Sequence, residues 1–189
     1  MKVPVEVSAR HVHLSENDLK SLFGENYSLT HKRDLSQPGQ FLCEERLEVV
    51  GEKGFFGSVA ILGPVRSQTQ VEISLTDSRK LGIAPFIRES GDLNGTPGCI
   101  LRGPKGEIKI DSGVIIAKRH IHMYTSDAEK IGAKNGQICK VKIESEERSL
   151  IFDDVVVRVS DKFALAMHID TDEGNAVNWK AGVFGNVIL

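Results

Sequence analysis

Four of the six histidines in the chain lie in two copies of an Arg-His-x-His motif. The first copy is Arg10-His11-Val12-His13, and the second is Arg119-His120-Ile121-His122. Residues i and i+2 share one face of a β-strand, where their Cα atoms lie about 6–7 Å apart. Two imidazoles with this spacing can bind one cation, while Val12 and Ile121 face the other side of the strand. The duplicated motif therefore indicates a paired metal site.

One copy alone is weak evidence, because exposed or structural histidines on a strand have the same spacing. Zinc accepts imidazole nitrogen and carboxylate oxygen, and each motif needs at least one further ligand. His168 is a candidate because it alternates with large apolar residues at 165–169, although a lone strand histidine is more often structural or exposed. Glu72 lies on the polar side of a strand expected at 70–75, where solvent exposure is the default expectation.

Arg66 lies in a segment suited to an anion, Gly63-Pro64-Val65-Arg66-Ser67-Gln68-Thr69-Gln70. A guanidinium forms paired hydrogen bonds with phosphate, and nearby hydroxyl and amide groups suit the same ligand. An ordinary surface arginine is the simpler alternative. Cys43, Cys99 and Cys139 belong to no nucleophile motif, and we expect them to be small buried residues.

The composition argues against several classes of protein. The 189 residues are 40% hydrophobic, which suffices for one core or two small ones. The net charge of −2 offers no basic surplus for nucleic acid or an anionic membrane, and no apolar run approaches a membrane span. Three widely spaced cysteines, with no leader apparent before the first motif, lead us to expect a cytoplasmic protein.

Each motif is followed by the pattern of a short capped helix. Ser15 is placed to cap a helix that stops at Gly24. After the second motif, Thr125 or Ser126 is expected to cap a helix that stops at Gly132. The sequence therefore predicts an internal duplication of a unit made of a strand with His-x-His and a helix.

The rest of the chain has the pattern of short strands. Segments 155–159 and 165–169 alternate, and glycine-bounded turns at 51–54 and 103–106 interrupt apolar or alternating stretches, as in hairpins. We therefore expect a mainly β protein of two closely apposed small β-barrels capped by short helices. The repeat by itself divides the chain near Gly113.

Six segments match one known family in order and nearly from end to end. The chain resembles the PduL-type phosphotransacylases (phosphate propanoyltransferases). The matching segments are Ser8-Ala9-Arg10-His11-Val12-His13-Leu14-Ser15, Leu35-Ser36-Gln37-Pro38-Gly39-Gln40-Phe41, Gly63-Pro64-Val65-Arg66-Ser67-Gln68-Thr69-Gln70-Val71-Glu72, Ser90-Gly91-Asp92, Arg119-His120-Ile121-His122-Met123 and Met167-His168-Ile169-Asp170-Thr171-Asp172-Glu173.

The resemblance implies an enzyme that exchanges the acyl group of an acyl-CoA onto inorganic phosphate, giving an acyl phosphate and CoA. It also implies two zinc ions per chain, at a site between two β-barrels. Arg66 takes the place of the family's phosphate-binding arginine. By this resemblance His11, His13 and Glu72 hold one zinc ion, and His120, His122 and His168 hold the other. CoA contacts are expected at Ser8, Arg33, Leu62 and Asn175.

The resemblance further implies an interleaved division of the chain. Residues 1–9 and 118–189 form one barrel, and residues 10–117 form the other, with 24–44 as a small lid. The family leads us to expect a homodimer. The extension that directs some members to bacterial microcompartments is not seen before the first motif, so a free cytoplasmic enzyme is expected. Tyr124 departs from the small residue that the family tends to have after the second motif.

Two other classes of protein remain as alternatives. A dinuclear zinc hydrolase also uses His-x-His, but 189 residues are few for the amidohydrolase barrel, and the chain has no His-x-His-x-Asp-His run. A bicupin-like metal-binding module also has His-x-His on a strand, but the glutamate that follows in cupins has a different spacing. Cleavage without phosphate favours the hydrolase, and metal binding without acyl-CoA chemistry favours the bicupin.

Overall fold

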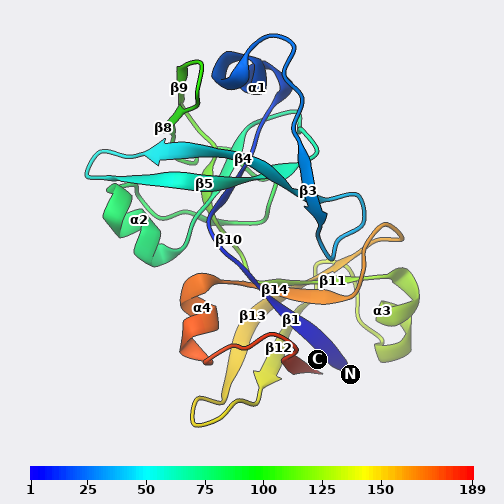
Figure 1. Cartoon of the computed structure of the whole chain (residues 1–189). Helices are drawn as coiled ribbons and strands as arrows, with labels where there is room; N and C mark the ends of the chain where they lie inside the picture. Colours follow the sequence, from blue (N-terminus) through cyan, green and yellow to red (C-terminus); the bar gives the residue numbers. More distant parts are fainter. The chain divides into compact units, whose positions relative to one another are not determined.

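The computed structural model describes residues 1–189 and shows a mainly β protein with short helices, as the sequence predicts (Figure 1). None of the helices has the length and apolar character needed to cross a membrane. The helices are α1 (Glu16–Phe23), α2 (Leu75–Leu81), α3 (Thr125–Ile131) and α4 (Thr171–Ala176). The strands are β1 (Lys2–Ser8), β2 (His11–His13), β3 (His31–Asp34), β4 (Phe41–Val50), β5 (Phe55–Gly63), β6 (Gln70–Glu72), β7 (Ile87–Arg88), β8 (Cys99–Arg102), β9 (Glu107–Ile110), β10 (Val114–Ala117), β11 (His120–Met123), β12 (Ile138–Ile143), β13 (Leu150–Val159), β14 (Ala166–Asp170) and β15 (Phe184–Ile188).

The chain divides into two compact units. The terminal unit comprises Met1–Ser8, Ser36–Pro38 and Lys118–Leu189, and the middle unit comprises Ala9–Leu35 and Gly39–Ala117. In the terminal unit the strands close into a barrel in the order β1-β14-β11-β13-β12-β15. β1 pairs with β15, so this barrel contains both chain termini (Figure 1).

The middle unit is a curled sheet in the order β7-β10-β6-β2-β5-β4-β8-β9, with β3 added beside β4. Its edge strands β7 and β9 do not pair with each other, so the second predicted barrel is a curled half-barrel. The glycine-bounded turns at 51–54 and 103–106 connect β4 to β5 and β8 to β9, as predicted.

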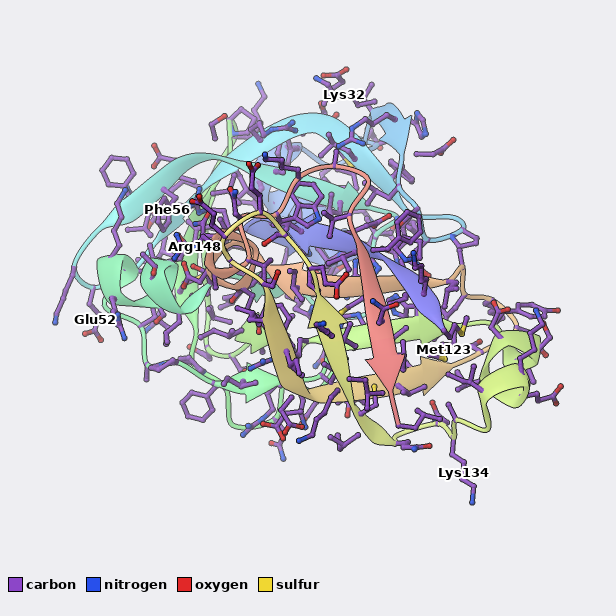
Figure 2. The ribbon with its side chains drawn as sticks, turned by 90° about the horizontal axis from the view of Figure 1, so that it is seen from below. Lys32, Glu52, Phe56, Met123, Lys134 and Arg148 are labelled. Atoms are coloured by element: carbon purple, nitrogen blue, oxygen red, sulfur yellow. The ribbon has the colours of Figure 1, made fainter.

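Each unit buries its own apolar core, and the residues that alternate with the motif histidines lie at its centre. Val12 and Leu14 are fully buried in the middle unit, and Ile121 and Met123 are fully buried in the terminal unit. Met123, labelled in Figure 2, lies where β11 leads into α3. Burial of such a side chain contributes about 1.5–3 kcal/mol. The cores therefore fix which face of β2 and β11 presents the histidines.

The predicted duplication is confirmed by strand pairing. In the middle unit β2 is parallel to β5 and antiparallel to β6. In the terminal unit β11 is parallel to β13 and antiparallel to β14. α1 follows β2, and α3 follows β11. The two His-x-His strands thus occupy equivalent central places, each between one parallel and one antiparallel neighbour.

The two helices that follow these strands begin differently. Ser15 caps α1 as predicted, because its hydroxyl accepts a hydrogen bond from Asp18 N, and the helix ends at Gly24. The prediction that Thr125 or Ser126 caps α3 is wrong. The cap residue is Tyr124, at the position equivalent to Ser15, and its side chain makes no capping hydrogen bond. α3 ends as predicted at Gly132, whose positive φ of 70° favours glycine.

Replacing Tyr124 by serine is expected to stabilise the protein. Tyr124 already has the extended backbone of a cap residue and a partly exposed side chain, so a hydroxyl there can accept a hydrogen bond from the first turn. A cap of this kind contributes between about 0.5 and 1 kcal/mol to the free energy of unfolding. Denaturant unfolding of the metal-free protein measures it, with Tyr124→Ala as the control for loss of the ring. Equal midpoints for the serine and alanine variants would contradict the prediction.

Two further helices were not expected from the alternating pattern. The strand predicted at 70–75 ends at Glu72, because Ser74 and Asp77 form a capping box that starts α2. Asp170 and Glu173 form the same box at the start of α4. In both cases a polar cap turns the chain from strand to helix within two residues.

Candidate metal and phosphate site

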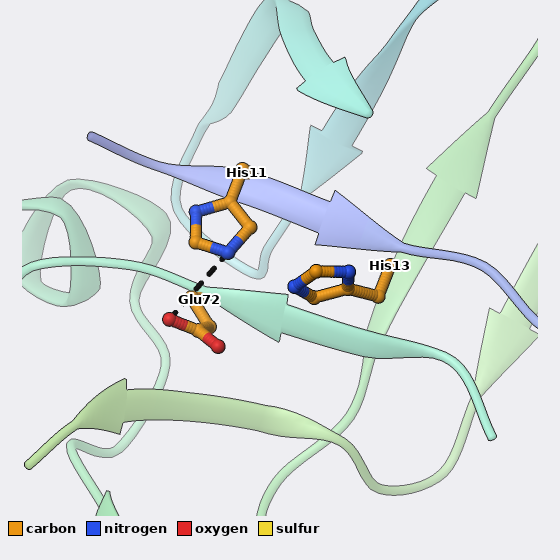
Figure 3. A group of neighbouring side chains, drawn as sticks. All are labelled: His11, His13 and Glu72. Atoms are coloured by element: carbon orange, nitrogen blue, oxygen red, sulfur yellow. Dashed lines mark ion pairs between the residues drawn. The ribbon is translucent and has the colours of Figure 1, made fainter. Parts of the chain in front are cut away.

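Three side chains from two neighbouring strands of the middle unit converge on one point (Figure 3). His11 and His13 project from one face of β2, and Glu72 reaches them from β6. The antiparallel register places His11 directly opposite Glu72. One ligand atom from each residue lies within 4.8 Å of those of the other two. Glu72 is largely buried here, so the default expectation of solvent exposure is wrong.

Backbone carbonyls orient both imidazole rings. His11 Nδ1 donates to Ala9 O at 2.9 Å, and His13 Nδ1 donates to Leu62 O at 3.2 Å. Since a carbonyl oxygen can only accept, Nδ1 carries a proton in each ring, and Nε2 is the nitrogen with which each ring can bind a metal. His11 Nε2 lies 3.5 Å from Glu72 Oε2. Histidines that bind metals have their second nitrogen held in this way.

The charges in this group suit a cation. Burial lowers the pKa of His13 to about 3, and the nearby charges of His11 and Arg66 add to the effect. His13 is therefore neutral at pH 7, as a metal ligand must be. Burial disfavours an ionised Glu72, but His11 and the hydrogen bond from Ser90 outweigh it and lower the pKa of Glu72. Burial also opposes a charged His11, yet Glu72 raises its pKa.

These residues fit a zinc ion. Two imidazole nitrogens and one carboxylate oxygen match the ligand set of catalytic zinc sites, which keep a further position open for substrate. Calcium and magnesium prefer all-oxygen sets. Glu72 also has outer partners: its Oε1 accepts hydrogen bonds from Gln70 Nε2 at 2.5 Å and from Ser90 Oγ at 3.1 Å. Oε2 is the oxygen left facing His11.

A second group of three histidines lies at the equivalent place in the terminal unit. His120 and His122 project from β11, and His168 on β14 is directly opposite His120. The ring centroids of the three lie 4.6, 5.3 and 5.0 Å apart. His120 Nδ1 donates to Lys118 O at 2.8 Å, as His11 does to Ala9 O. The third candidate ligand thus has the same register in both groups, Glu72 in one and His168 in the other.

His168 faces a carboxylate with its outer nitrogen. His168 Nδ1 lies 3.9 Å from Glu6 Oε2 on β1, and that oxygen accepts a hydrogen bond from Ser36 Oγ at 2.6 Å. A carboxylate behind an imidazole orients a metal-binding ring and raises its basicity. Three imidazoles are also a ligand set that fits zinc.

Arg66 lies beside the first group. Its backbone N donates to Leu14 O at 2.8 Å, which ties the Arg66 loop to the residue that follows His13. The guanidinium Nη1 donates to Ser90 Oγ at 3.2 Å, and Ser90 in turn donates to Glu72. Its charge contributes to the low pKa of His13. The structure therefore places a half-buried cation next to a candidate metal site, as binding of an anion there requires.

A model of the family described as phosphate propanoyltransferase matches residues 4–180, a range that includes both groups and Arg66. The chain belongs to this family. The phosphate propanoyltransferase of Thermotoga maritima is 55% identical over 178 residues, 94% of this chain and 85% of that protein. That of Listeria monocytogenes is 54% identical over 186 residues, 98% of this chain and 87% of that protein. That of Clostridioides difficile is 50% identical over 186 residues, 98% of this chain and 88% of that protein.

The four positions where resemblance to the phosphate propanoyltransferase family predicts CoA contacts lie on four elements. Ser8 ends β1, and Leu62 lies on β5, where its carbonyl binds His13. Arg33 on β3 and Asn175 on α4 are exposed. These assignments stay predictions.

The cysteines provide no nucleophile for the family's chemistry. All three are buried, as predicted. Burial raises the pKa of the thiols of Cys43 and Cys139 to about 11 and that of Cys99 to about 12. A thiol becomes nucleophilic as the thiolate, so these residues are unreactive at neutral pH.

Two residues next to the first group were not assigned a role from sequence. Gln70 is fully buried, and its Nε2 donates to both Ser90 Oγ, at 2.8 Å, and Glu72 Oε1. Gln70 Oε1 accepts from Gly91 N at 2.8 Å. Gln70 belongs to the segment of Arg66, and Ser90 belongs to the Ser-Gly-Asp segment. Both segments were noted in the sequence, but nothing in it showed that the two residues are in contact.

Proposed function

We propose that the protein transfers an acyl group, propanoyl among its substrates, between CoA and inorganic phosphate. The observation that carries the proposal is the link from Arg66 through Ser90 to Glu72 in a chain that belongs to the phosphate propanoyltransferase family. The guanidinium that we propose binds phosphate thus shares one hydrogen-bond network with the candidate metal site. The proposal includes two zinc ions per chain, one for each group of three ligands.

The reaction forms a bond from a phosphate oxygen to the thioester carbonyl carbon and breaks the carbon–sulfur bond, so CoA leaves as a thiolate. Phosphate is a weak and strongly hydrated nucleophile. Arg66 is proposed to bind it through paired hydrogen bonds and to hold it in position, which replaces an encounter in solution by an oriented one. When bound, zinc supplies a Lewis acid that polarises the carbonyl oxygen and stabilises the departing thiolate. Ser90 and Gln70 hold the Glu72 carboxylate and the Arg66 guanidinium at fixed places.

We propose direct transfer within a ternary complex, without an acyl-enzyme. The support is the burial of Cys43, Cys99 and Cys139, whose thiols stay protonated. An acyl group found on one of these cysteines in the active protein would count strongly against direct transfer.

The test is CoA release from propanoyl-CoA, measured with and without inorganic phosphate and compared with the acyl phosphate formed. The proposal predicts that release requires phosphate, equals the acyl phosphate produced, and stops when a chelator removes the metal. Release without phosphate would instead identify a zinc hydrolase. Absence of release from metal-loaded protein would favour a metal-binding module.

The remaining family expectations are part of the proposal. CoA is contacted by Ser8, Arg33, Leu62 and Asn175. Residues 24–44 act as a lid, and the protein is a cytoplasmic homodimer. The choice between acetyl and propanoyl groups rests on one methylene, which changes selectivity by only about 1–3 kcal/mol. Assaying acetyl-CoA beside propanoyl-CoA gives that selectivity directly.

A further inference from the structure

The arginine before the first His-x-His pair connects two elements of the candidate metal site. Arg10 Nε donates to Asp77 Oδ2 at 2.9 Å, and Arg10 Nη2 donates to Asp77 Oδ1 at 2.8 Å. Asp77 is buried and belongs to the capping box of α2, the helix that continues from β6. β2 carries His11 and His13, and β6 carries Glu72. Arg10 therefore ties the strand with two ligands to the helix that follows the third.

The second arginine makes the same connection in the terminal unit. Arg119 Nε lies 2.9 Å from Glu173 Oε1. Glu173 belongs to the capping box of α4, which continues from β14 and His168. Arg119 immediately precedes His120 on β11. The pairing thus recurs with a different acid and a different third ligand.

A third contact is also duplicated. The Arg10 guanidinium lies over the Phe56 ring, 4.1 Å from its centroid, and Phe56, labelled in Figure 2, belongs to β5. The Arg119 guanidinium lies 5.3 Å from the centroid of Phe152 on β13. β5 and β13 are the parallel neighbours of the two ligand strands. Each arginine therefore contacts an aromatic ring on the parallel neighbour of its strand and an acid on the helix that follows the antiparallel neighbour.

Sequence spacing around the third ligand is the same in both units. The helix cap lies two residues after the third ligand, at Ser74 and Asp170, and the acid lies five residues after it. The strands that set the register of the third ligand are short: β2 and β6 have three residues each, and β11 and β14 have four and five. So short a ladder has few hydrogen bonds to hold the register, and a bidentate arginine contact adds a fixed geometry.

We propose that Arg10 and Arg119 are positioning residues, each of which keeps the third ligand of its group opposite the two histidines. Arg10 acts on Glu72, and Arg119 acts on His168. This inference rests on the proposed pair of zinc sites. Neither arginine is proposed to contact substrate. Both have the same positioning role, one in each half of the chain.

The experiment measures the zinc affinity of each of the two sites in Arg10→Gln and Arg119→Gln, by competition with a chromophoric chelator. Each variant is expected to weaken one of the two sites and to leave the other unchanged. The loss should not exceed about 10–100-fold, the effect of removing a group bonded directly to a metal ligand, because each arginine acts through the helix that follows the third ligand. His122→Ala and His13→Ala backgrounds, each with one site disabled, show which site is affected. Arg102→Gln, which removes a surface ion pair with Glu107, is the control and should change neither.

Thermal unfolding of the metal-free variants separates positioning from general stability. Asp77, the partner of Arg10, is buried, and Arg10→Gln leaves its carboxylate without a charged partner, so this variant also risks misfolding. Arg10→Lys keeps the charge without the forked geometry, and it is expected to fold and to show a smaller, still site-selective loss of affinity. Equal weakening of both sites, or folded variants with unchanged affinities, would overturn the inference. Wild-type protein that binds no zinc would overturn the proposed metal sites themselves, and the inference with them.

Discussion

Replacing Arg66 by alanine is expected to lower kcat/KM for phosphate by about 10²–10³-fold, the usual effect of removing one charge-stabilising donor from an active site. The side chain donates to Ser90 Oγ, and the loop itself is held through its backbone N by Leu14 O. Truncation therefore removes the guanidinium without releasing the loop. Both zinc ions are expected to stay bound, and the KM for propanoyl-CoA should change little.

Arg66→Lys is the matched variant, because it retains a positive charge and loses the paired hydrogen bonds. Its kcat/KM should fall between those of the wild type and the alanine variant. Steady-state rates at varied phosphate concentration, with zinc content measured on the same samples, show whether Arg66 acts on phosphate. Loss of zinc from Arg66→Ala, or an effect confined to propanoyl-CoA, would show that Arg66 has another role.

Substitutions His13→Ala and His122→Ala are each expected to remove one of two zinc ions and to lower the rate by at least about 10³-fold. A Lewis acid contributes several kcal/mol to the transition state, and each 1.36 kcal/mol is tenfold in rate. Both histidines are buried, and each lies in a different group of three. Elemental analysis and phosphate-dependent CoA release measure the two effects.

The double variant distinguishes joint from separate action of the two groups. If the groups act as one unit, His13→Ala/His122→Ala should cost little more than either single change. His31→Ala is the control for metal content, because His31 is exposed on β3, and it should retain both zinc ions. A single variant that keeps two zinc ions would show that the substituted histidine is not a ligand.

Local patterns in the sequence were sufficient to predict the two His-x-His strands. Period-two alternation identified the face of His11 and His13, and the buried Val12 and Leu14 confirm it. The helix after the first of these strands was also predicted correctly, because the serine that caps α1 and the glycine that ends it are local signals. The same reasoning predicted the wrong cap residue for α3. That helix begins after Tyr124, which has the backbone geometry of a cap residue and makes no side-chain capping hydrogen bond.

Long-range pairing could not be read from the residues alone. Glu72 meets His11 because β2 and β6 are neighbours in the sheet, and no local signal states which strands pair. Alternation at 70–75 masked the start of α2, although Ser74 and Asp77 have capping-box spacing. The partner of Arg10 was missed for the same reason, because Asp77 lies on a helix that the alternating pattern concealed. The residue pattern offered His168 as a candidate and left Glu72 as an exposed residue by default, and the family resemblance assigned both as third ligands, a prediction that chemical analysis still has to test.

The most direct test of the central claim is titration of zinc into metal-free protein, followed by phosphate-dependent CoA release from propanoyl-CoA. Two groups of three ligands in one chain predict that activity reaches its plateau at two zinc ions per chain. A plateau at one ion per chain, or full activity before any zinc is added, would contradict the account.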